Sequence, residues 1–227
     1  MADDNTPELV IFDCDGVLVD SERISVRVGA ALLAEHGWEL TEEDFAARFV
    51  GCSAEFFDEQ VSAQLGPDLV RDWDRRHADR YRRAFEEELE AVHGVVELLT
   101  ALAARGTATC VASNSDHRHV EQVLRVAGLH DHLAGRVFSA HDGAAGKAAP
   151  DLFLHAARTL GTEPERCVVI EDSPFGVMAA RAAGMRCYGY AGGLTPAHRL
   201  SELGAVTFDA MTDLIEVLGL DPHPVAR

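Results

Sequence analysis

The chain has 227 residues, 47% of them hydrophobic, which is enough for one large domain or for a core domain that carries a smaller one. Its 38 acidic residues against 20 basic ones give a formal net charge of −18 at pH 7. A surface of this sign repels polyanions and therefore disfavours nucleic acid as a partner. Any site for a small anion must supply its own positive charge.

The cysteines and the N-terminal segment indicate the compartment. Five cysteines are scattered along the chain, and none forms a C-x-x-C pair. This pattern is typical of free thiols in a reducing compartment and disfavours disulfides or a zinc site. The first ten residues, MADDNTPELV, are acidic, and no apolar run is long enough to span a bilayer. We therefore expect a cytoplasmic protein that does not associate with membranes.

Patterns of strand and helix alternate along most of the chain. Short apolar runs of strand length lie at 8–12, 107–112, 136–138, 167–170, 185–190 and, more weakly, 205–208. Helical patterns lie at 94–105, 117–128, 151–160, 175–183 and 211–219. This alternation predicts an α/β fold, a doubly wound parallel sheet with helices on both faces. Such sheets bind ligands at the carboxyl ends of their strands.

Residues 21–89 interrupt this alternation. Their patterns are helical throughout, at 22–36, 42–49, 54–65 and 68–88, with glycine or Gly-Pro turns between them. We predict that 21–89 form an all-helical cap domain. The core domain would then consist of 1–20 and 90–227.

The first strand runs directly into Asp13-Cys14-Asp15-Gly16. In an extended chain, positions i and i+2 share a face, so both carboxylates can point into one cleft. Two such carboxylates suit a hard metal ion and can divide the work of nucleophile and acid–base group. An ordinary Asx turn at the end of a strand has the same residues, so this motif alone leaves both interpretations open.

Three more polar groups follow predicted strands. Ser113 and Asn114 precede a helix, where a hydroxyl and free N–H groups can hold a phosphate or simply cap the helix. Lys147 is the only lysine of the chain; it is either a site residue that must be a compact ammonium or a chance survivor on the surface. Glu171 and Asp172 could complete a Mg²⁺ site or cap a helix. Because all these groups follow parallel strands, we interpret them together as one active site.

The four motifs resemble a known family. FDCDGVLVDSE, VASNS, GKAAPD and VIEDSPFGV resemble, in this order, the four motifs of the haloacid dehalogenase (HAD) superfamily. The helical insert resembles the cap of the branch that contains β-phosphoglucomutase and many sugar-phosphate phosphatases. The resemblance implies a Mg²⁺-dependent phosphatase that acts on small phosphorylated metabolites. We also expect a monomer.

The resemblance also implies residue roles. Asp13 would attack phosphorus and form an aspartyl-phosphate, while Asp15 would protonate the leaving alcohol and then activate water. The phosphoryl oxygens would be bound by Ser113, Asn114 and Lys147. The Mg²⁺ ligands would be Asp13, the carbonyl of Asp15, Glu171 and Asp172.

Two alternatives are a sugar-phosphate mutase and a non-catalytic binding protein. The mutases of this branch carry a cap arginine and a cap histidine where this chain has Ala54 and Ser25, so we favour the phosphatase. Substrate selection is expected from Ser21, Arg23, Gly51 and Ala54. Five histidines between 117 and 141 lack a metal-binding spacing, and we interpret them as solvated surface.

Overall fold

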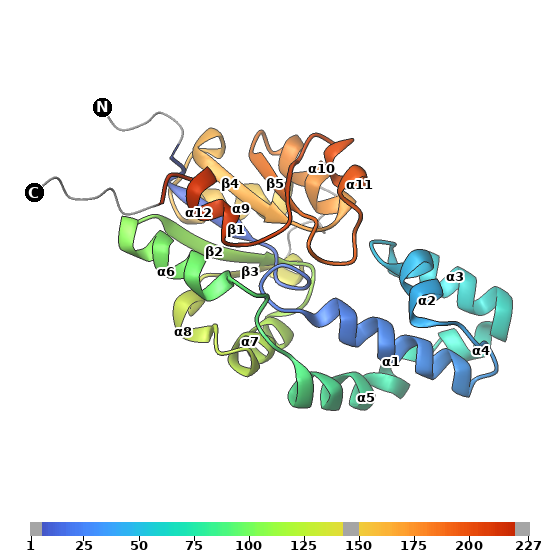
Figure 1. The fold of residues 1–227 in the computed structure, drawn as a ribbon. Coiled ribbons are helices and arrows are strands. Elements are labelled where there is room, and N and C mark those ends of the chain that lie inside the picture. The colour runs from blue at the N-terminus through green and yellow to red at the C-terminus, as the bar shows by residue number, and fades with distance from the viewer. Residues whose placement is uncertain (1–5, 143–149, 221–227) are drawn as a thin grey trace, which may run out of the picture.

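The computed structural model describes residues 6–142 and 150–220 of the chain. Its centre is a sheet of six parallel strands in the order β3-β2-β1-β4-β5-β6 (Figure 1). The strands are β1 (Leu9–Phe12), β2 (Ala108–Ser113), β3 (Val137–Ser139), β4 (Cys167–Glu171), β5 (Arg186–Tyr190) and β6 (Val206–Phe208). The α/β class and all six predicted strands are confirmed.

The central strand β1 is apolar on both faces because helices cover both faces of a parallel sheet. Val10 and Phe12 point into one half of the core, and Leu9 and Ile11 point into the other. The first half is completed by α6 (Val95–Arg105), α7 (His117–Val126), α8 (His130–Leu133) and α12 (Asp213–Val217). The second is completed by α9 (Asp151–Thr159), α10 (Pro174–Ala182) and α11 (Ala197–Ser201). Single 3-10 turns lie at Ala140–Asp142 and Pro164–Arg166.

The strand order creates the place for a site. In the sheet, Phe12 of β1 lies between Val111 of β2 and Ile170 of β4. From β1 the chain continues to β2 and β3 on one side and then crosses to β4 on the other side of β1, which makes this the topological switch point of the sheet. The segments that follow β1, β2 and β4 therefore converge at one edge.

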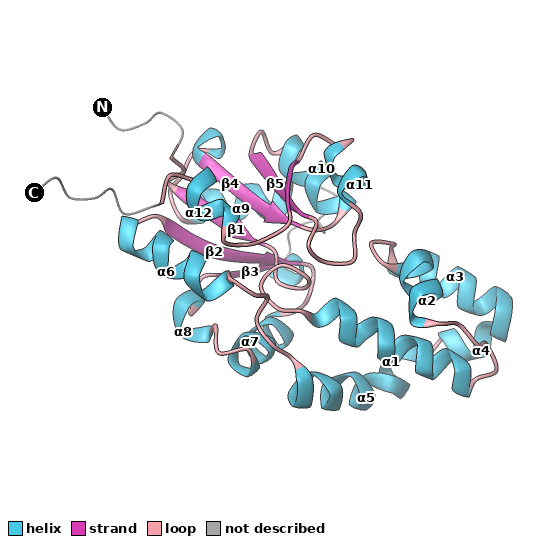
Figure 2. Ribbon diagram, in the orientation of Figure 1, coloured by secondary structure: helices cyan, strands magenta, loops and turns pink. Residues whose placement is uncertain are grey.

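Residues 21–88 form the helical block, which consists of α1 (Ser21–Glu35), α2 (Glu42–Phe49), α3 (Ala54–Leu65), α4 (Pro67–Val70) and α5 (Trp73–Glu88). Figure 2 shows this block as helix and loop, beyond the ends of the strands. Inside it, the ring of Phe57 lies 5.0 Å from that of Phe49 and 5.5 Å from that of Trp73. The helical character predicted for this segment is confirmed, while the domain boundaries stay a prediction.

One helix prediction in the block was wrong. The sequence pattern suggested a continuous helix over 68–88, but α4 ends at Val70 and α5 begins at Trp73. Asp72 leaves the helical region of backbone angles (φ −130°, ψ 19°), as aspartate favours helix starts over helix interiors. The break precedes Trp73, which is buried against Phe57.

Two backbone hydrogen bonds link the two segments that connect the core to the helical block. The N–H of Asp20 donates to the carbonyl of Glu90, and that of Val92 donates to the carbonyl of Leu18, both at 3.0 Å. The segments that enter and leave the block are therefore held side by side. No helix in the described part of the chain is both long and apolar enough to cross a membrane.

Candidate active site

Three acidic side chains meet at the switch point of the sheet. Asp13 directly follows β1, Glu171 ends β4, and Asp172 follows it. The N–H of Asp13 donates to the carbonyl of Ile170 (2.9 Å), which extends the pairing of β1 with β4 into the site. Carboxylate oxygens of the three acids all lie within 4.8 Å of one another, and all three residues are buried.

This cluster fits a hard divalent cation. Three buried carboxylates this close together repel one another, so they need a compensating positive charge. Carboxylate oxygens are the ligands that Mg²⁺ prefers. The residues present therefore fit Mg²⁺.

Glu171 is anchored by the start of α10. Its Oε2 accepts hydrogen bonds from the N–H groups of Asp172 (3.0 Å) and Ser173 (2.9 Å) and from the Ser173 hydroxyl (2.9 Å). The Ser173 hydroxyl in turn accepts from the N–H of Gly176 (3.0 Å) and so caps the helix. A Cβ at Gly176 would lie 1.9 Å from Oε1 of Glu171. The N-terminus of α10 and the lack of a side chain at Gly176 together determine where the Glu171 carboxylate points.

Gly16 brings the loop after β1 close to Asp172. Its φ is +81°, a region that side chains disfavour, and its N–H donates to the carbonyl of Val19 (2.9 Å). A Cβ at Gly16 would lie 2.1 Å from Oδ2 of Asp172. The glycine of the D-x-D-G motif is therefore required both for the turn and for the position of Asp172.

Asp15 is held by three elements. The Ser21 hydroxyl of α1 donates to its Oδ1 (2.8 Å), and the Ser115 hydroxyl, from the loop after β2, donates to its Oδ2 (3.3 Å). His119 of α7 places Nε2 at 3.7 Å from Oδ1, and its interaction with the Asp15 carboxylate raises the pKa of this histidine. His119 is half-buried beside the site, so the interpretation of the whole histidine group as solvated surface was wrong for this residue.

The serine-rich loop after β2 is ordered by its own hydrogen bonds. Ser113 is buried, and its hydroxyl accepts from the N–H of Ser115 (3.1 Å). The Ser139 hydroxyl of β3 donates to the carbonyl of Ser115 (2.8 Å). Asn114 lies on the same loop and is exposed. Lys147, the other residue predicted to bind the phosphoryl group, lies outside the described residues.

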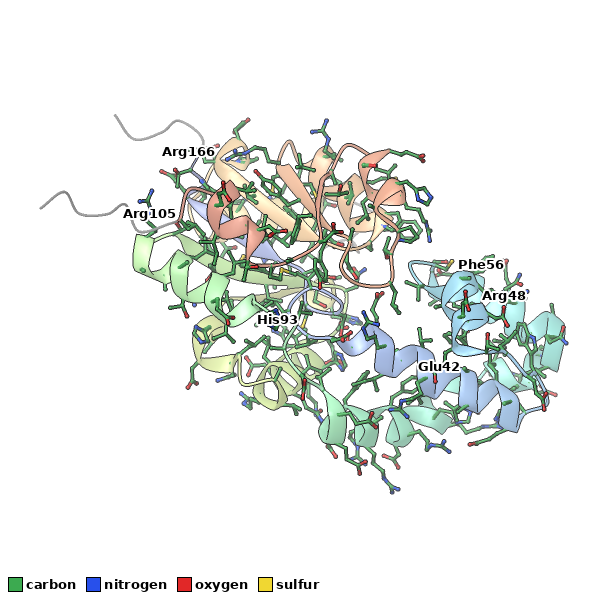
Figure 3. The ribbon with its side chains drawn as sticks, viewed as in Figure 1. Glu42, Arg48, Phe56, His93, Arg105 and Arg166 are labelled. Atoms are coloured by element: carbon green, nitrogen blue, oxygen red, sulfur yellow. The ribbon has the colours of Figure 1, made fainter. Side chains whose placement is uncertain are left out.

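A cavity of about 400 Å³ extends from Asp15 toward the helical block. Ser21, Gly51 and Ala54, three of the residues expected to select the substrate, line it together with Asp15. Arg23, the fourth, lines neighbouring hollows instead and pairs with Asp20 (3.1 Å). In Figure 3, the labels of Arg48 and Phe56 mark α2 and α3, two of the helices that supply walls of this cavity.

Glu22 is a cavity residue that the sequence analysis did not single out. Its Oε2 is buried and has no hydrogen-bond partner among the described residues. Burial raises the pKa of this carboxyl to about 7, with further contributions from the charges of Asp15, Asp20 and Glu171. Its position directly after Ser21 in the first motif was the one available signal.

Comparison with known proteins defines the class. Residues 7–184 match the haloacid dehalogenase-like hydrolase family, and the chain belongs to this family. The expected family is therefore confirmed.

Two bacterial relatives match most of the chain. A 6-phosphogluconate phosphatase of Escherichia coli is 32% identical over 183 residues, which cover 80% of this chain and 81% of the relative. A phosphorylated carbohydrates phosphatase of Thermotoga maritima is 30% identical over 213 residues, with 93% and 98% coverage. The chain also resembles the chloroplastic protein SUPPRESSOR OF QUENCHING 1 of Arabidopsis thaliana (36% identity), but it spans only 17% of that protein's length.

The fold has close structural counterparts. The crystal structure of a HAD family hydrolase from Deinococcus radiodurans, with bound phosphate and sodium, is similar with a TM-score of 0.83 and 35% identity. The similarity covers 97% of this chain and all of the other. The cytoplasmic location, the monomeric state and the lack of a nucleic-acid partner stay predictions.

Proposed function

We propose that this protein is a Mg²⁺-dependent phosphatase that hydrolyses small phosphorylated metabolites, sugar phosphates in particular, through an aspartyl-phosphate on Asp13. One observation carries the proposal. The buried carboxylate of Asp13 shares a metal-sized acidic cluster with Glu171 and Asp172, at the edge of the sheet where ligands bind. The two bacterial relatives, named as phosphatases of sugar-derived substrates, support the same substrate class.

The residues of the site divide the reaction into two steps. In the first, a carboxylate oxygen of Asp13 attacks phosphorus, the bond from phosphorus to the ester oxygen breaks, and Asp15 gives a proton to the departing alkoxide. In the second, Asp15 takes a proton from water, which attacks phosphorus and releases inorganic phosphate from Asp13. Bound Mg²⁺ would be held by Asp13, Glu171, Asp172 and the carbonyl of Asp15, and would offset the charge of the phosphoryl oxygens.

Phosphoryl binding is assigned to the loop after β2 and to Lys147. The buried hydroxyl of Ser113 and the neighbouring Asn114 would bind phosphoryl oxygens, and Lys147 would supply the local positive charge that an acidic protein needs. Ser113 ends β2, beside β1 and Asp13, which supports its share of this role.

The cavity favours a phosphatase over a mutase. A sugar-phosphate mutase must hold a second phosphate while the first one is transferred. Among the described residues that line the cavity, none is lysine, arginine or histidine, and Ser25 and Ala54 cannot bind a dianion strongly. A non-catalytic binding protein would not need two aspartates in the positions of nucleophile and acid–base group.

The test is chemical trapping of the intermediate. The protein is mixed with Mg²⁺ and acetyl phosphate or a sugar phosphate, quenched in acid, digested and analysed by mass spectrometry. We expect one added phosphoryl group on the peptide that contains Asp13, and its loss after treatment with hydroxylamine. Mg²⁺-dependent release of phosphate without any such adduct, in repeated rapid-quench experiments, would reject the covalent mechanism.

A phosphorus NMR experiment separates the phosphatase from the mutase. The substrate is β-glucose 1-phosphate, with glucose 1,6-bisphosphate as primer. We expect inorganic phosphate to appear first. Faster formation of glucose 6-phosphate would identify a mutase.

A further inference from the structure

The cavity beside Asp15 has an acidic side. Two more carboxylates besides Asp15 line it, Glu22 from α1 and Asp58 from α3. Among its described lining residues there is no lysine, arginine or histidine to balance them. The part of the substrate that enters this cavity is the leaving group, since Asp15 lies at the boundary between cavity and catalytic cluster.

Three arginines of the helical block form ion pairs with carboxylates outside the cavity. On α1, Arg23 pairs with Asp20 (3.1 Å) and Arg27 pairs with Glu88 (2.7 Å). On α5, Arg80 pairs with Glu35 (3.0 Å). None of these three arginines lines the cavity. Arg199 of α11 donates to the carbonyl of Val50 (3.4 Å) and does not line the cavity either.

The same cavity also has an aromatic lining. Phe45, Phe49, Phe57, Trp73 and Tyr81 line it. Three of them form a continuous surface, because Phe57 lies 5.0 Å from Phe49 and 5.5 Å from Trp73 between ring centroids. Aromatic faces accept the C–H face of a ring or a cation, and their negative quadrupole disfavours anions.

Carboxylates and aromatic rings that line one cavity favour groups rich in hydrogen-bond donors. Glu22 has a buried oxygen without a partner among the described residues, which a hydroxyl or an ammonium of the substrate can satisfy. A second phosphate or a carboxylate at the same place would face like charge in a partly desolvated pocket. The cavity thus discriminates by charge and by hydrogen-bond donors.

We propose that the preferred substrate is the monophosphate of a polyol or amino-polyol, whose leaving group is rich in hydroxyl or ammonium donors and carries no second anionic group. This proposal rests on the phosphatase function proposed above and narrows its substrate class. It differs from what the name of the E. coli relative states for that protein, because 6-phosphogluconate carries a carboxylate.

The experiment compares four hexose derivatives that differ mainly in the charge of the leaving group. They are glucosamine 6-phosphate, glucose 6-phosphate, 6-phosphogluconate and glucose 1,6-bisphosphate, each assayed for kcat/KM at neutral pH with saturating Mg²⁺. We expect the amino sugar and the neutral sugar to exceed both anionic compounds by roughly 10- to 100-fold, as one like-charge contact in a partly buried site allows. A higher kcat/KM for glucosamine 6-phosphate than for glucose 6-phosphate would identify the ammonium as the preferred donor.

Two variants test which residues produce the discrimination. Glu22→Gln and Asp58→Asn should each reduce the ratio between neutral and anionic substrates severalfold. Glu59→Gln is the matched control for Asp58→Asn. Glu59 is an exposed acidic residue of the same helix, α3, and it does not line the cavity. This variant should leave the ratio unchanged.

The possible outcomes separate this proposal from the proposed function. Hydrolysis of the bisphosphate or of 6-phosphogluconate as fast as glucose 6-phosphate would overturn the charge selection and leave the phosphatase standing. Turnover of p-nitrophenyl phosphate with none of the four hexose derivatives would also overturn it. If p-nitrophenyl phosphate too releases no phosphate with Mg²⁺ present, the proposed function itself is wrong.

Discussion

The acidic cluster at the strand ends, which we call the floor of the site, and the cavity lining contributed by the helical block, which we call its wall, are built in different ways. On the floor, formed by the core, Asp13, Glu171 and Asp172 follow neighbouring strands, and Glu171 alone accepts three hydrogen bonds. On the wall, formed by the helical block, aromatic rings and carboxylates line a cavity in which an oxygen of Glu22 is left without a partner among the described residues.

This difference separates chemistry from selection. Buried, hydrogen-bonded carboxylates on strand ends are held in place before substrate arrives, which is what electrostatic catalysis requires. A buried polar atom without a partner is costly unless a ligand satisfies it. We therefore assign the reaction to the core and the choice of substrate to the cavity wall.

The largest expected effect comes from the floor. Asp13→Asn should lower kcat by at least about 10³-fold, because an amide cannot attack phosphorus, a loss typical for the removal of a nucleophile. Circular dichroism and the thermal midpoint should stay close to those of the wild type. The matched control is Asp131→Asn, an exposed aspartate of α8, which should retain full activity. More than a few per cent of wild-type activity in Asp13→Asn would contradict the covalent mechanism.

The next effect tests the geometry of the metal site. Gly16→Ala should weaken Mg²⁺ binding by about 10-fold or more, a typical cost of displacing a group that orients a metal ligand. The added Cβ would overlap with Asp172 at 2.1 Å and would also strain a residue at φ +81°. Mg²⁺ affinity is measured by calorimetry and, independently, from the Mg²⁺ dependence of activity.

Gly161→Ala separates the two causes of that loss. Gly161 has φ +71°, yet no atom lies within 4 Å of where its Cβ would be. This variant should lose some stability and keep its Mg²⁺ affinity. Equal losses of Mg²⁺ affinity in the two variants would show that backbone strain, and not contact with Asp172, explains the effect.

Sequence motifs predicted the floor because it is local. Each carboxylate follows a strand within one or two residues, and the strand order of a parallel sheet brings such positions together. The wall could not be predicted in the same way. Glu22 and His119 reach the site only through the packing of α1 and α7. The aromatic lining combines residues from α2, α3 and α5, and helical periodicity did not reveal the break at Asp72 that precedes Trp73.

A third prediction concerns His119, at the junction between floor and wall. Because its Nε2 lies 3.7 Å from Asp15, we expect it to orient that carboxyl for proton transfer to the leaving group. His119→Gln should therefore lower kcat/KM for alkyl phosphates about 10-fold more than for p-nitrophenyl phosphate, whose leaving group needs little protonation. This constant reports on the first step alone, so the second role of Asp15 does not obscure the result.

His117→Gln is the control for that experiment. It removes an exposed histidine from the first turn of the same helix, and it should not change the ratio between the two substrates. A uniform decrease for both substrates in His119→Gln would mean that this residue supports the fold and does not position Asp15.

The smallest expected effect concerns the pH dependence of thermal stability, through a buried histidine of the helical block. His77 is buried, its Nε2 has no hydrogen-bond partner among the described residues, and its ring lies 4.4 Å from that of Trp73. Burial, with a smaller contribution from His36, lowers its pKa below the ordinary value of 6.5. Folding therefore favours the neutral ring, and the unfolded chain binds the proton more tightly. The stability that this residue contributes is fully present above about pH 6.5 and is lost as the pH falls below this value toward the lower pKa of the folded state.

Thermal midpoints measured from pH 8 to pH 5 should thus decline by a few degrees more in the wild type than in His77→Phe, which keeps an aromatic ring and cannot titrate. His198→Gln, at an exposed histidine of α11, should follow the wild type. Parallel curves for wild type and His77→Phe would show that the acid sensitivity of the protein arises elsewhere, and the block would then owe no part of its pH dependence to this buried ring.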